Sequence, residues 1–204
     1  MKVTVIIPYN VSRGYLEEAI ESLENQTYDD IEILIEHGDC LASENFNRGL
    51  EKATGELVRY LCEDDLLTKN SIADAVEYFK NNSEVDFIHS NAINFFEDGT
   101  EDMWVPSDIV LTLDSMLNRY AIHGGTVVYR KRCFEKRAMD LTLWTGEEYD
   151  FNMWLLSNNY KMGYLNSFTY KYRRHSSQKS LGISSPEYQA KRQVEKDKIK
   201  NRYI

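Results

Sequence analysis

The chain has 204 residues, of which 42% are hydrophobic and 28% charged, and its formal net charge at neutral pH is −9. This length and composition suit one globular domain with a real core, and the negative charge argues against a nucleic-acid-binding surface. Three widely spaced cysteines without a CxxC pair predict free thiols in a reducing compartment. No stretch approaches the roughly 20 apolar residues that span a bilayer, so we expect a cytoplasmic protein with at most peripheral membrane contact.

The first part of the chain alternates predicted strands with predicted helices. A β-branched run at residues 3–7, stopped by Pro8, has the form of a buried parallel strand. Apolar residues then recur at helical spacing between Leu16 and Leu23, and residues 31–35 form a second strand pattern. A strand, a helix and a strand in this order predict a right-handed crossover between parallel strands.

The later elements complete an α/β pattern. Further strands are expected at residues 57–62, 85–89, 92–96, 162–165 and 168–172, and helices at 43–53, 68–79, 113–117 and from 146 onward. The pair Gly124-Gly125 leads into another strand, and the charge-rich tail at residues 186–204 is helical or partly disordered. The alternation predicts a single α/β domain over residues 1–204, with a mainly parallel central sheet flanked by helices.

Three loops after predicted strands carry polar side chains. They are Tyr9-Asn10, Glu36–Asp39 and Glu63–Asp65. Because ligands of parallel sheets bind outside the carboxyl ends of the strands, we expect these loops to build one site.

The run Glu63-Asp64-Asp65 is the most informative stretch. Adjacent carboxylates at the end of a buried strand repel each other, and a hard divalent cation with oxygen ligands can offset that repulsion. Mg²⁺ or Mn²⁺ would suit such ligands, and could neutralise an anionic substrate approaching an acidic protein. The competing interpretation is a solvated acidic turn that caps the next helix.

Several common catalytic motifs are absent from the sequence. No GxGxxG follows the first strand, and there is no GxxxxGK[ST], HExxH or GxSxG. The remaining groups with chemistry are the acidic run, Glu36 and Asp39, the pair Glu147-Glu148, and a late basic cluster at residues 173–175.

In these segments the chain resembles the GT-A-fold glycosyltransferases, most of all family 2. The similarity runs in order through residues 3–10, 15–28, 31–38, 47–56, 63–65, 146–148 and 172–175, and so covers nearly the whole chain. It implies a nucleotide-sugar-binding half over about residues 1–100 and an acceptor and catalytic half over about 101–180.

The resemblance also implies roles for individual residues. Glu148 is the expected catalytic base, with Glu147 supporting it, and the metal ligands are Asp65, Asp64 and His175. Gly124, Gly125 and Trp144 are expected on the acceptor side, with Trp104 as a further stacking platform. The nucleotide-sugar contacts are expected from Pro8, Tyr9, Asn10, Glu36, Asp39, Asn47, Glu63, Asp64 and Arg173.

The chain departs from the family pattern at four places. Cys62 stands where the first aspartate of the DxD motif is expected, and Glu148 replaces an aspartate as base. The second strand ends in Glu36-His37-Gly38-Asp39 rather than two aspartates, and Phe46 replaces an arginine. Metal binding should therefore depend chiefly on Asp65.

The expected function is metal-dependent transfer of a single sugar, with inversion, from a nucleotide-diphosphate sugar to a hydroxyl acceptor. UDP-sugar is the preferred donor, Mn²⁺ or Mg²⁺ the cofactor, and a polysaccharide, glycolipid or glycoprotein the acceptor. Two alternatives stay open. One is a degenerate GT-A domain that only binds nucleotide-sugar or glycan, and the other is a sugar-1-phosphate nucleotidyltransferase.

Overall fold

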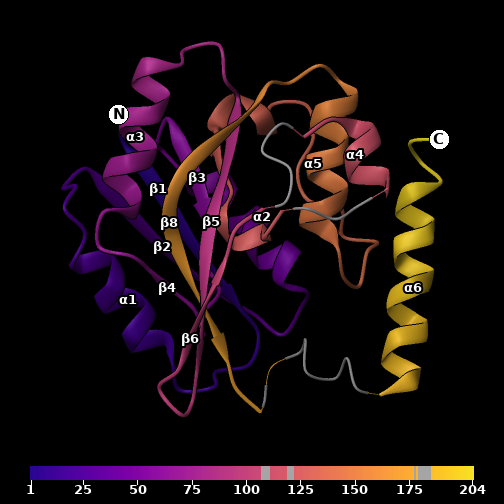
Figure 1. The fold of residues 1–204 in the computed structure, drawn as a ribbon, viewed down its shortest axis with the longest axis horizontal. Coiled ribbons are helices and arrows are strands. Elements are labelled where there is room, and N and C mark those ends of the chain that lie inside the picture. The colour runs from indigo at the N-terminus through magenta and orange to yellow at the C-terminus, as the bar shows by residue number, and fades with distance from the viewer. Residues whose placement is uncertain (107–110, 119–121, 177, 179–184) are drawn as a thin grey trace.

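The computed structural model describes all residues except 107–110, 119–121, 177 and 179–184. A central sheet of eight strands lies between layers of helices (Figure 1). The strands are β1 (Val3–Tyr9), β2 (Ile31–His37), β3 (Leu57–Tyr60), β4 (Leu66–Leu67), β5 (Phe87–Phe96), β6 (Glu101–Trp104), β7 (Val128–Arg130) and β8 (Met162–Arg174). The helices are α1 (Leu16–Glu24), α2 (Ala42–Lys52), α3 (Ser71–Asn81), α4 (Leu113–Asn118), α5 (Glu147–Ser157) and α6 (Pro186–Lys200), with 3-10 turns η1 (Gly124–Thr126) and η2 (Lys131–Phe134).

The strand order is β2-β1-β3-β7-β5-β8-β4, with β6 paired to β5 beside this path. The predicted crossover is confirmed, since β1 pairs in parallel with both β2 and β3. Strands β5 and β8 are also parallel, whereas β7, β6 and β4 run antiparallel to their neighbours. The α/β class is confirmed, but the sheet is mixed because these three short strands turn back against the longer ones.

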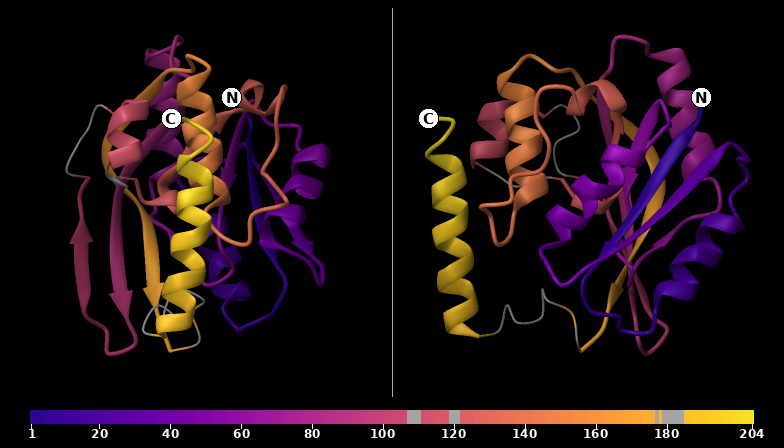
Figure 2. Two further views of the ribbon diagram at one scale, coloured as in Figure 1. Left: turned by 90° about the vertical axis from the view of Figure 1, so that its right-hand side faces the viewer. Right: turned by 180° about the vertical axis from the view of Figure 1, so that it is seen from behind.

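Each face of the sheet has its own hydrophobic core. Side chains alternate along β1, so Val5 and Ile7 pack toward α1 and α3 while Ile6 packs toward α2 and α5. Figure 2 shows these helices on opposite sides of the strands. Period-2 alternation in buried strands thus produces a three-layer domain, with the loops free at the sheet edges.

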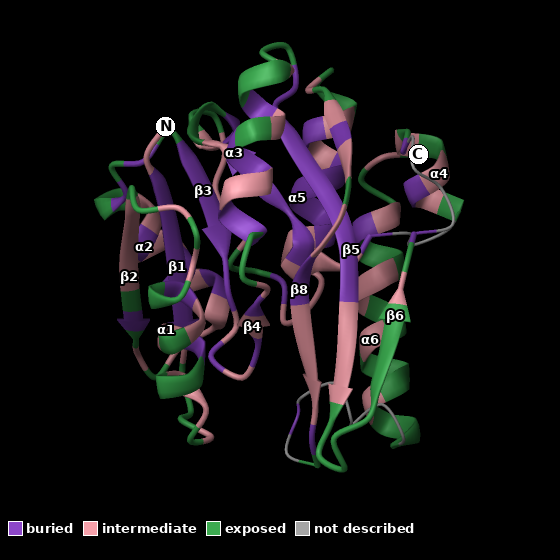
Figure 3. Cartoon of the chain, turned by 60° about the vertical axis from the view of Figure 1, so that its left-hand side comes forward, coloured by how far each residue is buried: buried purple, intermediate pink, exposed green. Residues whose placement is uncertain are grey.

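Two long strands replace four short predicted ones. Residues 85–96 contain one strand, β5, and residues 162–174 contain one strand, β8. The pairing of β5 with β8 shifts register on both sides of Asn91, and this irregularity accounts for the break in the sequence pattern. The carboxyl half of β5 is less buried than its amino half, and β6 is largely exposed (Figure 3).

Two helices begin at other residues than predicted. Thr68 does not start a helix, because β4 pairs with β8 at Leu66–Leu67 and α3 begins only at Ser71. Helix α2 begins at Ala42, one residue before its predicted start. Periodicity predicts a helix locally, but tertiary pairing also decides where the helix starts.

The charged tail forms α6, which stands beside α4 and α5 (Figure 1). Ser185 caps it by accepting a hydrogen bond from the Tyr188 amide at 3.2 Å. At the other end Ile199 is buried, and Arg202 forms an ion pair with the buried Asp150 at 2.9 Å. No helix among the described residues is long and apolar enough to cross a membrane.

Candidate active site

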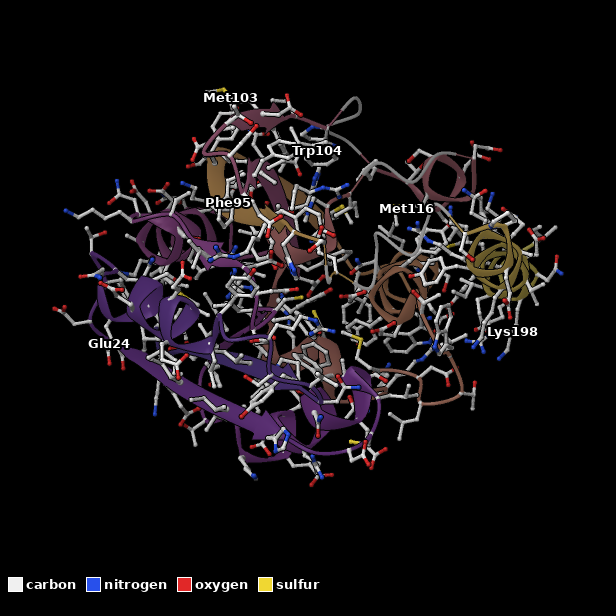
Figure 4. All side chains as sticks on the ribbon, turned by 90° about the horizontal axis from the view of Figure 1, so that it is seen from below. Glu24, Phe95, Met103, Trp104, Met116 and Lys198 are labelled. Carbon is white, nitrogen blue, oxygen red and sulfur yellow. The ribbon has the colours of Figure 1, made fainter. Side chains whose placement is uncertain are left out.

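The acidic run lies in a tight turn at the end of β3. Strand β3 ends at Tyr60, and the Leu61 amide still donates to the Ile6 carbonyl of β1 at 3.0 Å. The chain then turns, with the Asp65 amide donating to the Cys62 carbonyl at 3.2 Å. The run therefore lies at the edge toward which β1, β5 and β8 run, and Figure 4 views this side of the molecule.

Asp65 is almost fully buried at the centre of this edge. The Tyr170 hydroxyl donates to its Oδ2 at 2.6 Å, and the Arg173 amide donates to its Oδ1 at 2.8 Å. Burial, followed by the charge of Asp64, raises the pKa of Asp65 to about 8 despite these two bonds. The ionised form of Asp65 is therefore disfavoured in the metal-free protein.

Close packing against a glycine brings Tyr170 to Asp65. A Cβ atom at Gly125 would lie only 2.1 Å from Cζ of Tyr170, so no larger residue fits without moving the ring. The buried Arg59 holds the two segments together, because its Nη2 donates to the Gly125 carbonyl and to Thr169, each at 3.2–3.3 Å. The missing side chain of Gly125, in the predicted glycine pair, therefore leaves the space that the Tyr170 ring occupies.

Cys62, Asp64 and Asp65 form a group that could hold a metal ion, with one ligand atom of each within 4.8 Å of the others. A carboxylate has about four lone-pair positions, and the bonds from Tyr170 and Arg173 use two of those of Asp65. The group fits a divalent cation, whose charge would offset the repulsion between Asp64 and Asp65. Burial raises the pKa of the Cys62 thiol well above its usual value, so this residue is a neutral neighbour in the metal-free protein.

His175 stands behind this group rather than within it. Its Nε2 lies 3.1 Å from Oδ2 of Asp64, and its ring packs edge-on against Tyr15. The described ligand group does not include His175. The role of His175 as a metal ligand therefore stays a prediction, and its described contact is with the Asp64 carboxylate.

Two cavities meet at Cys62. The first, of about 320 Å³, is lined by the predicted residues Pro8, Tyr9, Asn10, Glu63 and Asp64, and by Val11, Arg13, Leu41, Ala42, Tyr60, Cys62 and Trp144. Glu63 is buried there and accepts a bond from the Arg13 amide at 3.0 Å, while its Oε2 has no partner among the described residues. This cavity collects the loops after β1 and β3, as the topology predicted.

The second cavity, of about 370 Å³, contains the predicted base. It is lined by Cys62, Asp65, Trp104, Ile122, His123, Gly124, Gly125, Glu148, Tyr170, Tyr172, Arg174 and Arg192. Burial, followed by the charge of Arg174, lowers the pKa of His123 to about 4, so that imidazole is neutral. Glu148 also lines a third cavity of about 120 Å³, beside Thr145, Gly146, Tyr149, Arg192 and Lys196.

Four of the predicted site residues have positions or contacts that differ from the expected ones. Glu36 points under α2, where it pairs with Lys52 at 2.7 Å, and Asp39 is exposed and lines neither cavity. The Asn47 amide is bonded to both backbone groups of Met139 at 2.9 and 3.1 Å, so it anchors a loop. Trp144 lines the first cavity, on the Tyr9 side, rather than the acceptor side.

The basic cluster divides between two faces of β8. Arg173 donates to the Asp64 carbonyl at 2.9 Å and to Glu18 at 2.7 Å, and its guanidinium lies over Tyr15 at 4.2 Å. These contacts hold the Arg173 side chain beside Asp64, and its predicted contact with the nucleotide-sugar stays a prediction. Arg174 faces the second cavity instead, because successive residues of a strand point to opposite sides.

Sequence reasoning missed Tyr170 and Arg192, and also Arg174 as the arginine that reaches a cavity. Tyr170 is one of 14 tyrosines, and only the β4–β8 pairing places it against Asp65. Arg192 comes from α6, and no local signal connects that helix with the cavity. Glu147 lines none of the three cavities described above, although it opens α5 directly before Glu148.

A larger cavity, of about 600 Å³, lies between α2 and η2 and is lined by Asn47, Leu50, Phe134, Leu141 and their neighbours. Its walls are mainly apolar, and the ligand group of Cys62, Asp64 and Asp65 does not contribute to it. The candidate metal ligands therefore lie at the first and second cavities, at the sheet edge.

No protein-family model matches the chain. Among curated proteins it is similar to an uncharacterized glycosyltransferase of Rickettsia felis, with 25% identity over 90% of this chain and 36% of that protein. It is also similar to an uncharacterized glycosyltransferase of Methanocaldococcus jannaschii, with 23% identity over 83% of this chain and 69% of that protein. The chain thus spans about a third of the length of the Rickettsia relative.

Among solved structures the chain resembles S. aureus TarS. For TarS residues 1–349 in complex with UDP-GlcNAc the TM-score is 0.69, with 17% identity over 87% of this chain and 60% of that chain. For the complex with UDP the TM-score is 0.67, with 17% identity over 100% of this chain and 70% of that chain. The chain therefore has the GT-A fold, and its distant homologues are glycosyltransferases.

Proposed function

We propose that this chain is a metal-dependent glycosyltransferase that moves a single sugar from a UDP-sugar to a hydroxyl of a glycan, glycolipid or glycoprotein. One observation carries the proposal: Asp64 and Asp65 lie where two cavities meet, and the second cavity also contains Glu148. Complexes of the structurally similar TarS with UDP-GlcNAc and with UDP support the choice of donor.

The first cavity would receive the nucleotide. Its Tyr9 and Trp144 offer ring faces for a base, and Asn10 offers an amide for hydrogen bonding. The orphaned Oε2 of Glu63 is a buried acceptor that a ribose hydroxyl could satisfy. The diphosphate would then reach the junction at Cys62, beside the two aspartates.

Asp65 and Asp64, with Cys62 adjacent, would hold the cation. A bound Mn²⁺ or Mg²⁺ would neutralise the negative charge that develops on the leaving diphosphate. Tyr170 and the Arg173 amide keep the Asp65 carboxylate fixed, and His175 does the same for Asp64. These contacts preorganise the pair before the donor arrives.

Glu148 would act as the general base. It takes the proton of the acceptor hydroxyl as that oxygen bonds to the anomeric carbon, and the bond from that carbon to the diphosphate oxygen breaks with its electron pair. Attack from the side opposite the diphosphate inverts the anomeric centre. The position of Glu148 in the second cavity, which Asp65 also lines, supports this assignment.

The test measures UDP release from a panel of UDP-sugars with Mn²⁺, for the natural sequence and for Glu148→Gln. We expect the substitution to lower kcat by about 10²–10⁴-fold while the Kd for UDP is unchanged. Glu187→Gln, at an exposed first-turn glutamate of α6, is the matched control and should leave both unchanged.

A degenerate domain is the second candidate, and Cys62 in the ligand group is the observation that favours it. If UDP binds but no donor of the panel is ever turned over, with or without acceptor, this binding function replaces the enzymatic one. Proton NMR of the first product of the active protein would show whether the anomeric centre is inverted.

A further inference from the structure

Helix α6 brings positive charge to the acceptor side of the site. Arg192 and Lys196 are four residues apart, so they share one face of the helix. Arg192 lines the second and third cavities, both of which include Glu148, and Lys196 lines the third. Arg174 of β8 also lines the second cavity.

The contacts of α6 hold this face in place. Near its start, Tyr188 packs edge-on against Trp144 at 5.1 Å, and Nζ of Lys191 lies 4.1 Å from the centre of the same indole ring. Near its end, Ile199 is buried and Arg202 is paired with Asp150. Arg192 lies between these two anchors, so its position in the cavity is built into the fold.

Two carboxylates share these cavities with the three cations, since Glu148 lines both and Asp65 lines the second. Among the described residues, no carboxylate forms an ion pair with Arg174, Arg192 or Lys196. Burial, followed by the charges of Arg192 and Lys200, lowers the pKa of Lys196, which shows that neighbouring cations repel it. In the third cavity the cations Arg192 and Lys196 exceed the single lining carboxylate, Glu148, although the whole chain has a net charge of −9.

We propose that Arg192, Lys196 and Arg174 bind an anionic group of the acceptor, a phosphate or carboxylate carried close to the hydroxyl that receives the sugar. This inference rests on the proposed function, in which the acceptor lies beside Glu148. The planar guanidinium group can donate two parallel, charge-assisted hydrogen bonds to two oxygens of a carboxylate or a phosphate. The third cavity, of about 120 Å³, has room for one such group.

The donor diphosphate is the other anion that these cations could serve. The third cavity is lined by Arg192 and Lys196 but not by Cys62, Asp64 or Asp65. This separation favours the acceptor, and it allows the two sources to be distinguished by saturating the donor site first.

The experiment measures binding rather than turnover, so its failure is distinct from failure of the proposed function. Protein saturated with UDP and Mg²⁺ is titrated with glucose 6-phosphate and with glucose, a pair that differs by the phosphate alone. We expect glucose 6-phosphate to bind at least about tenfold more tightly, and Arg192→Gln or Lys196→Gln to remove most of that difference.

Lys198→Gln is the matched control, because Lys198 lies on α6 outside both cavities, where it donates to the Thr142 carbonyl. It should leave the phosphate preference intact, and circular dichroism should show all variants folded. The proposal is overturned if glucose 6-phosphate and glucose bind alike. It is also overturned if Arg192→Gln and Lys196→Gln weaken UDP binding instead, because the cations would then serve the donor.

Discussion

The hydrogen bond from Tyr170 to Asp65 gives a quantitative prediction about metal affinity. A hydrogen bond to a charged group contributes about 1.5–3 kcal/mol, which equals about 1–2 pKa units. Asp65 already has its pKa raised to about 8, first by burial and then by Asp64, while the Tyr170 bond lowers it. Tyr170→Phe should therefore raise this pKa to roughly 9–10.

The consequence is visible in metal binding, because a metal must displace the proton of Asp65. For the natural sequence, Mn²⁺ affinity should rise about tenfold per pH unit up to pH ~8 and then level off. For Tyr170→Phe it should level off about 1–2 units later, so that at pH 7 affinity is about 10–100-fold weaker.

The assay is calorimetric titration with Mn²⁺ between pH 6 and 9. Tyr172→Phe is the control, because Tyr172 shares its face of β8 with Tyr170 and, in the described contacts, makes no bond to Asp65. Superimposable pH profiles for Tyr170→Phe and the natural sequence would show that Tyr170 does not lower the pKa of Asp65.

Three further predictions concern packing and stability. Gly125→Ala places a methyl against Tyr170, so urea unfolding should show a loss of about 1–3 kcal/mol and weaker Mn²⁺ binding; unchanged values would contradict the packing. In the metal-free protein the folded-state pKa of Asp65 lies above its unfolded value, so its stabilising effect is complete below pH ~4 and is lost as pH rises through about 8. Scanning calorimetry should find this decline in Tm for the natural sequence and a shallower one for Asp65→Asn. Asp150→Ala removes the buried partner of Arg202, so Tm should fall by roughly 6–12 °C and α6 should become sensitive to protease, whereas a protected α6 would contradict its proposed anchor.

The part of the site that follows strand ends could be predicted from the sequence. Strand and helix periodicity are local, and they locate the turn at residues 63–65 and the helix start at Glu147. The rule that loops at the carboxyl ends of parallel strands converge then brings Tyr9, Asn10 and Asp64 to one cavity.

The part that depends on side-chain direction could not be predicted. Whether Glu36 faces α2 or the cavity, and whether Arg173 or Arg174 reaches the ligand, depends on a one-residue alternation set by sheet register. The contribution of Arg192 depends on how a terminal helix docks, which rests on distant contacts such as the pair of Asp150 and Arg202.

Asp65 is proposed to hold the cation that binds the donor diphosphate. Anomalous diffraction at the manganese edge, from crystals grown with Mn²⁺ and UDP, would locate that cation. One peak is expected about 2.1 Å from a carboxylate oxygen of Asp65, with the diphosphate on its other side and the uracil in the cavity lined by Tyr9 and Trp144. UDP bound in that cavity without a manganese peak at Asp65 would overturn the assignment.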